Sequence, residues 1–168
     1  RRILTVCAGK ERFGIGSVTN LGERWRKVEK AMKKLLVATD FSELARQAYG
    51  AATSLAKTYD AKIHLVHQAE PLPYLYTGGS TAATQLDEYY DRLHAELEQE
   101  AEQPALKNLP VSTQVLCTRQ QSMTLVDFAE SEECDLIVMS THGRSGLAHS
   151  LLGSFTEKTA RHTAVPVL

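Results

Sequence analysis

The amino-acid sequence predicts one α/β domain with a parallel sheet and helices on both of its faces. From Lys33 onward, apolar runs of strand length alternate with segments of helical periodicity, in the order β-α-β-α-β-α-β-α-β. Most of the strand segments are nearly continuous in their apolar character, as parallel strands buried on both faces are. The chain has 168 residues, which is the length of one ordinary domain.

Five segments are predicted as strands, each for a local reason. The first, second and fourth are short apolar runs, which is typical of buried strands. The third alternates between apolar and polar residues. The fifth contains Pro166, which a strand tolerates only at its start or at the edge of a sheet. The segments are 35–39, 63–67, 111–117, 136–139 and 165–168.

The helices between these strands are predicted from capping residues and periodicity. Ser42 can cap the first helix, with Glu43 in its first turn. The run Ser154-Phe155-Thr156-Glu157 matches a capping box, which makes Ser154 the expected N-cap of the last helix. The expected buried faces are Leu44, Ala48, Ala51 and Leu55 in the first helix, and Leu86, Tyr90, Leu93 and Leu97 in the second.

The charges of the chain are nearly balanced. It has 19 Lys and Arg against 20 Asp and Glu, a formal net charge of -1. This balance provides no general field for nucleic acid or for an anionic membrane, so neither is expected as a partner. The acidic run from Glu96 to Glu102 is expected to be a solvated helix face. Cys7, Cys117 and Cys134 show no CxxC spacing, which favours a reducing, cytoplasmic location over a disulfide framework or a zinc site.

Residues 1–31 do not continue the alternating pattern. Leu21, Trp25, Val28 and Met32 make only a weak amphipathic helical stripe. We therefore expect 1–31 to be an N-terminal appendage, either disordered or a weak helix, ahead of a domain that spans 32–168.

The segment richest in chemistry follows the fourth predicted strand. Residues 140–146 contain two glycines, and Gly153 precedes the last helix. Glycine lets backbone N–H groups approach a phosphate closely, and a helix start adds N–H groups and a favourable dipole. Arg144 could add a charge-assisted hydrogen bond. The same glycines could instead serve only turns and helix packing, so both interpretations stay open.

Asp40 directly follows the first predicted strand. If the strand order reverses between the first and fourth strands, Asp40 and Ser140 meet at one crevice beyond the carboxyl ends of the strands. A carboxylate there could accept hydrogen bonds from ribose hydroxyls or help to hold a metal on phosphates. The alternative is an ordinary loop aspartate that caps the following helix.

The segments 37–42 and 140–156 resemble the universal stress protein family. The resemblance extends from about Lys33 to Leu168. The family's ATP-binding signature is glycine, two residues, glycine, nine residues, glycine and then Ser or Thr. The spacing is kept here, with Ser140 in place of the first glycine, followed by Gly143, Gly153 and Ser154. The resemblance implies an α/β fold of the adenine nucleotide alpha hydrolase-like type: a five-stranded parallel sheet with strand order 3-2-1-4-5 and helices on both faces.

The resemblance also implies a set of ATP-binding residues. Gln68 falls where the family usually contacts adenine through the backbone and commonly has an apolar residue. Asp40 is the one candidate metal ligand, through Mg²⁺ or Mn²⁺ on the phosphates, and no catalytic residue is identified. The implied set is Ala38, Thr39 and Asp40 near the adenosine, Gln68 at the base, Met139, Ser140, His142 and Gly143 along the loop after the fourth strand, and Gly153, Ser154, Phe155 and Thr156 at the phosphates.

Three functions remain open at this point. The first is an ATP-binding universal stress protein, a stress-response module regulated by nucleotide occupancy. The second is a slow ATP hydrolase, for which the sequence shows no evident base for water. The third is a nucleotide-free dimer that binds partners through its surface. The family commonly forms homodimers through the last strand, so a homodimer is expected, whereas the signalling partner is not identified.

Overall fold

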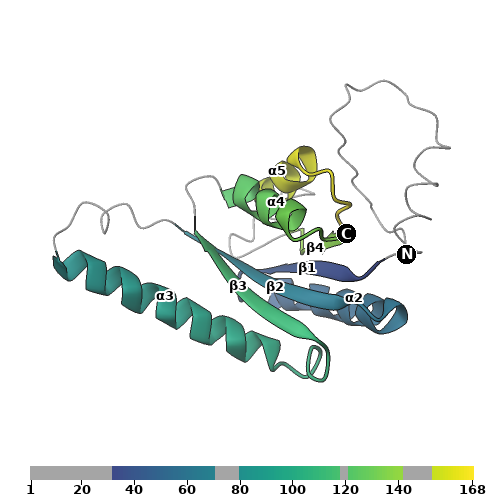
Figure 1. Ribbon diagram of the computed structural model, residues 1–168, viewed down its shortest axis with the longest axis horizontal. Helices are drawn as coiled ribbons and strands as arrows, with labels where there is room; N and C mark the ends of the chain where they lie inside the picture. Colours follow the sequence, from purple (N-terminus) through teal and green to yellow (C-terminus); the bar gives the residue numbers. More distant parts are fainter. Residues whose placement is uncertain (1–31, 71–79, 118–120, 142–152) are drawn as a thin grey trace.

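The computed structural model describes residues 32–70, 80–117, 121–141 and 153–168 (Figure 1). The expected appendage 1–31 lies outside these residues. Four parallel strands form one sheet in the order β3-β2-β1-β4. The strands are β1 (Lys34–Thr39), β2 (Lys62–Ala69), β3 (Val111–Cys117) and β4 (Leu136–Val138). The chain therefore winds outward from β1 in one direction to β3 and in the other direction to β4, and the expected order 3-2-1-4 is confirmed.

The expected fifth strand is the part of the fold that needs correction. The segment 165–168 lies beside β4, but it makes only one isolated parallel bridge, between Ile137 and Val167. Three backbone hydrogen bonds support that bridge: Ile137 N–H to Pro166 O at 2.9 Å, Leu168 N–H to Ile137 O at 2.8 Å, and Met139 N–H to Leu168 O at 3.1 Å. This ladder is too short to be a strand, so the described sheet has four strands and not five.

Helices cover both faces of the sheet, as expected (Figure 1). Helices α2 (Glu43–Tyr59) and α3 (Ser80–Ala101) pack on one face, and α4 (Gln121–Ser131) and α5 (Ser154–His162) pack on the other. None of the helices in the described part of the chain is long and apolar enough to span a bilayer.

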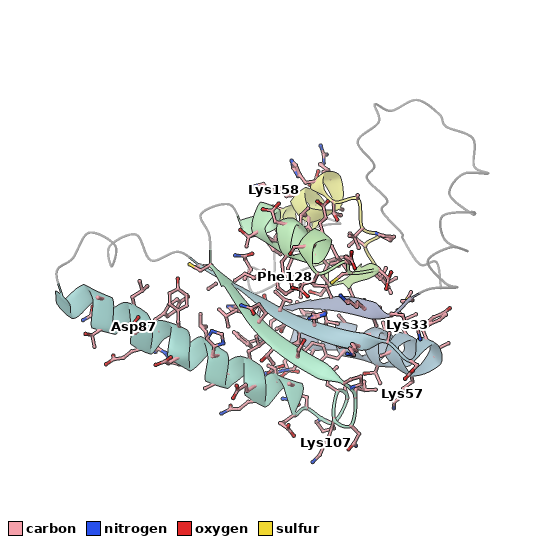
Figure 2. All side chains as sticks on the ribbon, viewed as in Figure 1. Lys33, Lys57, Asp87, Lys107, Phe128 and Lys158 are labelled. Atoms are coloured by element: carbon pink, nitrogen blue, oxygen red, sulfur yellow. The ribbon has the colours of Figure 1, made fainter. Side chains whose placement is uncertain are left out.

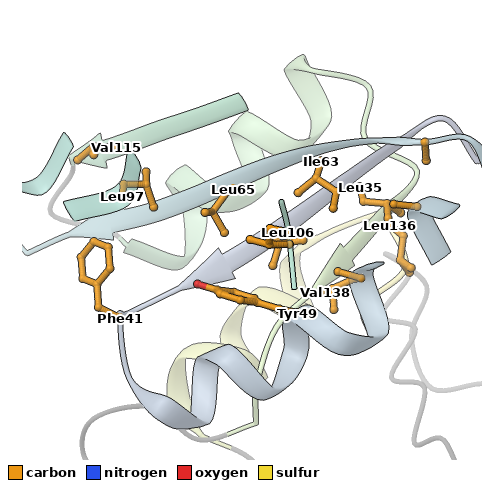
Figure 3. Close-up of a cluster of buried hydrophobic side chains, with 14 of the residues drawn as sticks. Leu35, Phe41, Tyr49, Ile63, Leu65, Leu97, Leu106, Val115, Leu136 and Val138 are labelled. Carbon is orange, nitrogen blue, oxygen red and sulfur yellow. The ribbon is translucent and has the colours of Figure 1, made fainter. Parts of the chain in front are cut away.

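The strands divide their side chains between two cores because successive residues point to opposite faces. Leu35 of β1 and Leu65 of β2 face α2 and α3, where Figure 3 shows them opposite Tyr49. Leu36 and Val66 face α4 and α5 instead. All four strand residues are fully buried. Strands that must be apolar on both sides produce the continuous hydrophobic runs of the sequence.

Helix α2 begins as the sequence indicates but buries a different face. The Ser42 side chain accepts a hydrogen bond from Ala45 N–H at 3.1 Å, so the predicted N-cap is confirmed. The expected buried face is only partly right: Ala48 and Leu55 are partly buried against the core, whereas Leu44 is 39% exposed and Ala51 is exposed. The observed face brings the large ring of Tyr49 into the core. The buried residues of α2 are Ala45, Tyr49, Ala52 and Ala56.

A buried carboxylate joins α3 to α2. Glu100 is only 3% exposed, so the expectation that the whole acidic run is solvated is wrong at this position. Arg46 Nε donates to both carboxylate oxygens of Glu100 at 3.1 Å, and Arg46 Nη2 lies 2.5 Å from Oε1. Tyr49 Oη lies 2.9 Å from Glu100 Oε2. Burial of a carboxylate is tolerated here because it is paired and hydrogen-bonded.

The same network reaches the end of β1. Tyr49 Oη lies 2.9 Å from Thr39 Oγ1 as well as from Glu100 Oε2. Because a carboxylate only accepts, the Tyr49 hydroxyl donates to Glu100 and Thr39 donates to Tyr49. Burial raises the pKa of Tyr49 above its ordinary value, which keeps this donor protonated. The side chain of Thr39 is thereby tied to both helices on its face of the sheet.

We expect Leu97→Ala to lower the free energy of unfolding by about 2–5 kcal/mol, since Leu97 is fully buried and its truncation leaves a cavity. Leu44→Ala should change it by less than about 0.5 kcal/mol, because Leu44 is on the exposed side of α2. Urea denaturation of both variants measures the difference. Equal losses would contradict the burial of Leu97 in α3 or the exposure of Leu44 in α2.

We expect Glu100→Gln to lower the free energy of unfolding by about 1.5–3 kcal/mol. The substitution removes the charged carboxylate to which Arg46 and Tyr49 donate hydrogen bonds. The matched control is Glu98→Gln, at an exposed position of the same helix, with a change within about 0.5 kcal/mol. Thermal and urea unfolding compare the two, and a Glu100→Gln variant as stable as its control would show that the network contributes nothing.

Candidate functional site

A cavity of about 550 Å³ lies beyond the carboxyl ends of β1 and β4, where the strand order reverses. Ligands in open α/β sheets commonly bind at such a point. His142, Gly143 and Arg144 lie outside the described residues. Ten of the predicted site residues line the cavity: Ala38, Thr39, Asp40, Gln68, Met139, Ser140, Gly153, Ser154, Phe155 and Thr156.

The turn after β1 presents Asp40 to this cavity. Asp40 Oδ1 accepts hydrogen bonds from Ser42 N–H at 3.0 Å and from Ser42 Oγ at 2.5 Å. Between them, Phe41 has a left-handed backbone with φ 66°, and its N–H donates to Thr39 Oγ1 at 3.1 Å. Asp40 therefore does not cap α2 itself. It holds Ser42, the residue that caps the helix, and it lines the cavity.

His67 is a cavity residue that the sequence-based site does not include. It is 6% exposed, and its ring stacks on Phe41 with a centroid distance of 4.2 Å. Its Nδ1 lies 2.8 Å from Thr39 O, and because a carbonyl oxygen only accepts, Nδ1 carries the proton. The residue ties the end of β2 to the end of β1 and so supports the turn that carries Asp40.

His64 faces the other side of the sheet, as the odd spacing between the two histidines predicts. Its ring meets the ring of Phe128 edge to face, with a centroid distance of 6.1 Å. Figure 2 labels Phe128 on α4. Burial lowers the pKa of His64, so the neutral ring is favoured there. His64 and His67 thus do not form one metal site.

Two hydrogen bonds join the loop after β4 to the start of α5. Gly153 N–H donates to Thr141 O at 2.6 Å, and Thr156 Oγ1 donates to Ser140 O at 3.0 Å. Segments that are more than ten residues apart in the chain are therefore held together at one end of the cavity. The spacing of the glycines in the sequence could not by itself indicate that these two segments are hydrogen-bonded to each other.

Helix α5 begins with an N-terminus that no side chain caps. The N-cap is Gly153 with φ −64° and ψ 146°, and Ser154 is the first helical residue, so the expected capping box with Ser154 as N-cap is wrong. The first bond along the helix runs from Glu157 N–H to Gly153 O at 2.9 Å. The N–H groups of Ser154, Phe155 and Thr156 consequently have no acceptor within the helix. All three residues line the cavity.

The far wall of the cavity comes from α3. This helix contributes Tyr89, Arg92, Leu93 and Glu96, and Glu70, which directly follows β2, lines the cavity as well. No local pattern in the sequence points to these residues, because only the order of the strands brings α3 to this edge. Within the described ranges, no group of three or more His, Cys, Asp or Glu side chains could hold a metal ion by itself.

The cavity therefore combines three kinds of group. An uncapped helix end offers N–H donors and a positive dipole to an anion. Asp40 offers a carboxylate to hydroxyl groups or to a metal ion that the anion carries. Ala38 and Met139 together provide an apolar part of the cavity wall. This arrangement fits an elongated ligand with an apolar ring at one end and an anionic group at the other.

Comparisons with known proteins assign the family. The model of the universal stress protein family matches residues 32–168. The chain is 31% identical over 152 residues to universal stress protein MJ0531 of Methanocaldococcus jannaschii, and the match covers 85% of this chain and 84% of the relative.

The fold of this chain is similar to the solved structure of MJ0577 from the same organism, with a TM-score of 0.70 at 24% identity over 81% of this chain and 93% of the other. It is also similar to a universal stress protein solved in complex with cAMP, with a TM-score of 0.56 at 25% identity over 82% and 95%. The chain belongs to the universal stress protein family.

Proposed function

We propose that this protein binds ATP in the cavity at the ends of β1 and β4, and acts as a stress-response module regulated by nucleotide occupancy. The observation that carries the proposal is the meeting of three distant segments around one cavity: the turn at Asp40, the residues Ser140 and Thr141, and the uncapped start of α5. These are an acceptor for ribose, a loop after a central strand, and an anion-binding helix end.

The free energy that each contact contributes to binding determines how many contacts the site needs. A helix end contributes about 0.3–1 kcal/mol to binding an exposed anion, whereas micromolar affinity requires about 8 kcal/mol. One helix end is therefore insufficient. In the proposal, Ser154, Phe155 and Thr156 bind the phosphates through their backbone, together with the loop that contains His142, Gly143 and Arg144. Contacts to ribose and base supply the rest.

A divalent cation fits this arrangement as a companion of the phosphates. Mg²⁺ is usually bound through one or two carboxylates plus substrate phosphates, and Mn²⁺ also prefers oxygen ligands. Asp40 is the carboxylate that the proposal assigns to it, directly or through water. The cation would neutralise part of the triphosphate charge next to Asp40.

The family supports an adenine nucleotide as the ligand. A relative at 25% identity was solved in complex with cAMP, which contains adenine, ribose and a phosphate. We favour ATP over a nucleotide with one phosphate because the start of α5 offers the N–H groups of three successive residues to anionic groups. As in other family members, we also propose a cytoplasmic homodimer that forms along the segment 165–168, which lies at the edge of the sheet beyond β4.

We expect Mg-ATP at 100 times its Kd to raise the melting temperature by about 5 °C or more, because a ligand that binds only the folded state stabilises it by about 2.7 kcal/mol at that concentration. Differential scanning fluorimetry measures the shift, and isothermal titration calorimetry gives the Kd. No shift with millimolar Mg-ATP would contradict the proposal.

We expect Ser154→Asp to weaken ATP binding at least about tenfold, since it places a carboxylate where the phosphates should lie. The same change should leave the ligand-free melting temperature equal or higher, because an acidic residue in the first turn stabilises a helix. Ser154→Ala is the control and should bind ATP nearly as the unchanged protein does. Equal affinities for the two variants would place the phosphates elsewhere.

A further inference from the structure

The side chain of Gln68 is the clearest unexplained feature of the cavity. Gln68 is the penultimate residue of β2 and lines the cavity. Its Nε2 donates to Leu116 O on β3 at 3.2 Å. Its Oε1 is buried and has no hydrogen-bond partner. The only other such side-chain atom in the described residues, Thr159 Oγ1, does not line the cavity.

The orientation of this amide is set by its neighbour. A backbone carbonyl oxygen can only accept a hydrogen bond, so the amide nitrogen of Gln68 must face Leu116. The remaining atom is then a carbonyl oxygen, which accepts and cannot donate. A buried acceptor without a donor is unfavourable, and native structures normally supply a partner. The missing partner is therefore a hydrogen-bond donor.

The position of Gln68 in the sheet indicates which part of a ligand it meets. Thr39 pairs with His67, so Asp40, which directly follows β1, and Gln68 on β2 lie just past that pair. Gln68 shares a face with Val66, and Ala38 and Met139 pack on the same face. If Asp40 meets the ribose, the base lies against these apolar residues and next to the amide of Gln68.

We propose that Gln68 Oε1 accepts a hydrogen bond from the exocyclic 6-amino group of adenine, and that this contact makes the site select adenine over 6-oxo purines. The inference rests on the proposed function. Adenine offers an N–H donor at position 6, whereas hypoxanthine and guanine offer a carbonyl oxygen. Two acceptors would then face each other without a proton between them: the purine oxygen would lose its solvent partner on binding, and Gln68 Oε1 would stay unpaired.

Binding of ATP and of inosine triphosphate tests this contact, because the two differ in the 6-substituent and in the protonation of N1. Calorimetry on the unchanged protein should give at least about tenfold tighter binding of ATP. Gln68→Met keeps the length of the side chain but removes the acceptor, and should bring the two affinities within about threefold, mainly by weakening ATP. Gln114→Met is the matched control: Gln114 lies on β3, donates from Nε2 to Val115 O at 3.0 Å and does not line the cavity. It should keep the full preference.

A change in the ligand gives the same test without any change in the protein. An ATP analogue with two methyl groups on the 6-amino nitrogen has no donor there and should bind at least about tenfold more weakly than ATP. If ATP binds but the preference persists in Gln68→Met, or the dimethyl analogue binds as ATP does, the assignment of Gln68 is wrong while the proposed function stands. If the unchanged protein binds none of these nucleotides, both are wrong.

Discussion

The pairing of β1 with β4 is the constraint on which the cavity depends. It aligns Leu35 with Leu136 and Val37 with Val138, so that Ala38 and Met139 end up next to each other at the carboxyl edge. At the opposite edge, Asp135 Oδ2 accepts from Lys33 N–H at 2.7 Å and from Lys34 N–H at 2.9 Å, which secures the start of the same pairing. A shift of one residue would move every side chain of β4 to the wrong face.

Hydrogen bonds from the helices hold the polar groups of the cavity wall in place relative to this strand pairing. Thr39 belongs both to the cavity wall and to the buried chain of hydrogen bonds that runs through Tyr49 to Glu100 and Arg46. Its carbonyl is held by His67, and its hydroxyl also accepts from Phe41 N–H. Each of these contacts restrains the turn that carries Asp40. The site is therefore built on the core of the domain, where backbone positions are well determined.

Much of the fold and part of the site could be predicted from the sequence, because both depend on patterns that are local. Continuous apolar runs identified the parallel strands, and the glycines near Gly153 identified one end of the cavity. The predictions were wrong at positions whose surroundings are determined by contacts between distant segments of the chain. Glu100 is buried where Arg46 and Tyr49 reach it from another helix, and the N-cap of α5 is Gly153, whose N–H donates to Thr141 O on a distant segment. Arg92 enters the cavity wall only because of the strand order, which no local pattern contains.

In the proposed complex, one nucleotide bridges the turn at Asp40 and the start of α5. An NMR titration that follows backbone amide signals tests this most directly, with Mg-ATP compared against adenosine, which has no phosphates. We expect ATP to shift the amide signals of Asp40, Phe155 and Thr156 together along one binding curve, and adenosine to leave those of Phe155 and Thr156 nearly unshifted. ATP that shifts neither segment, or only one of them, would contradict it.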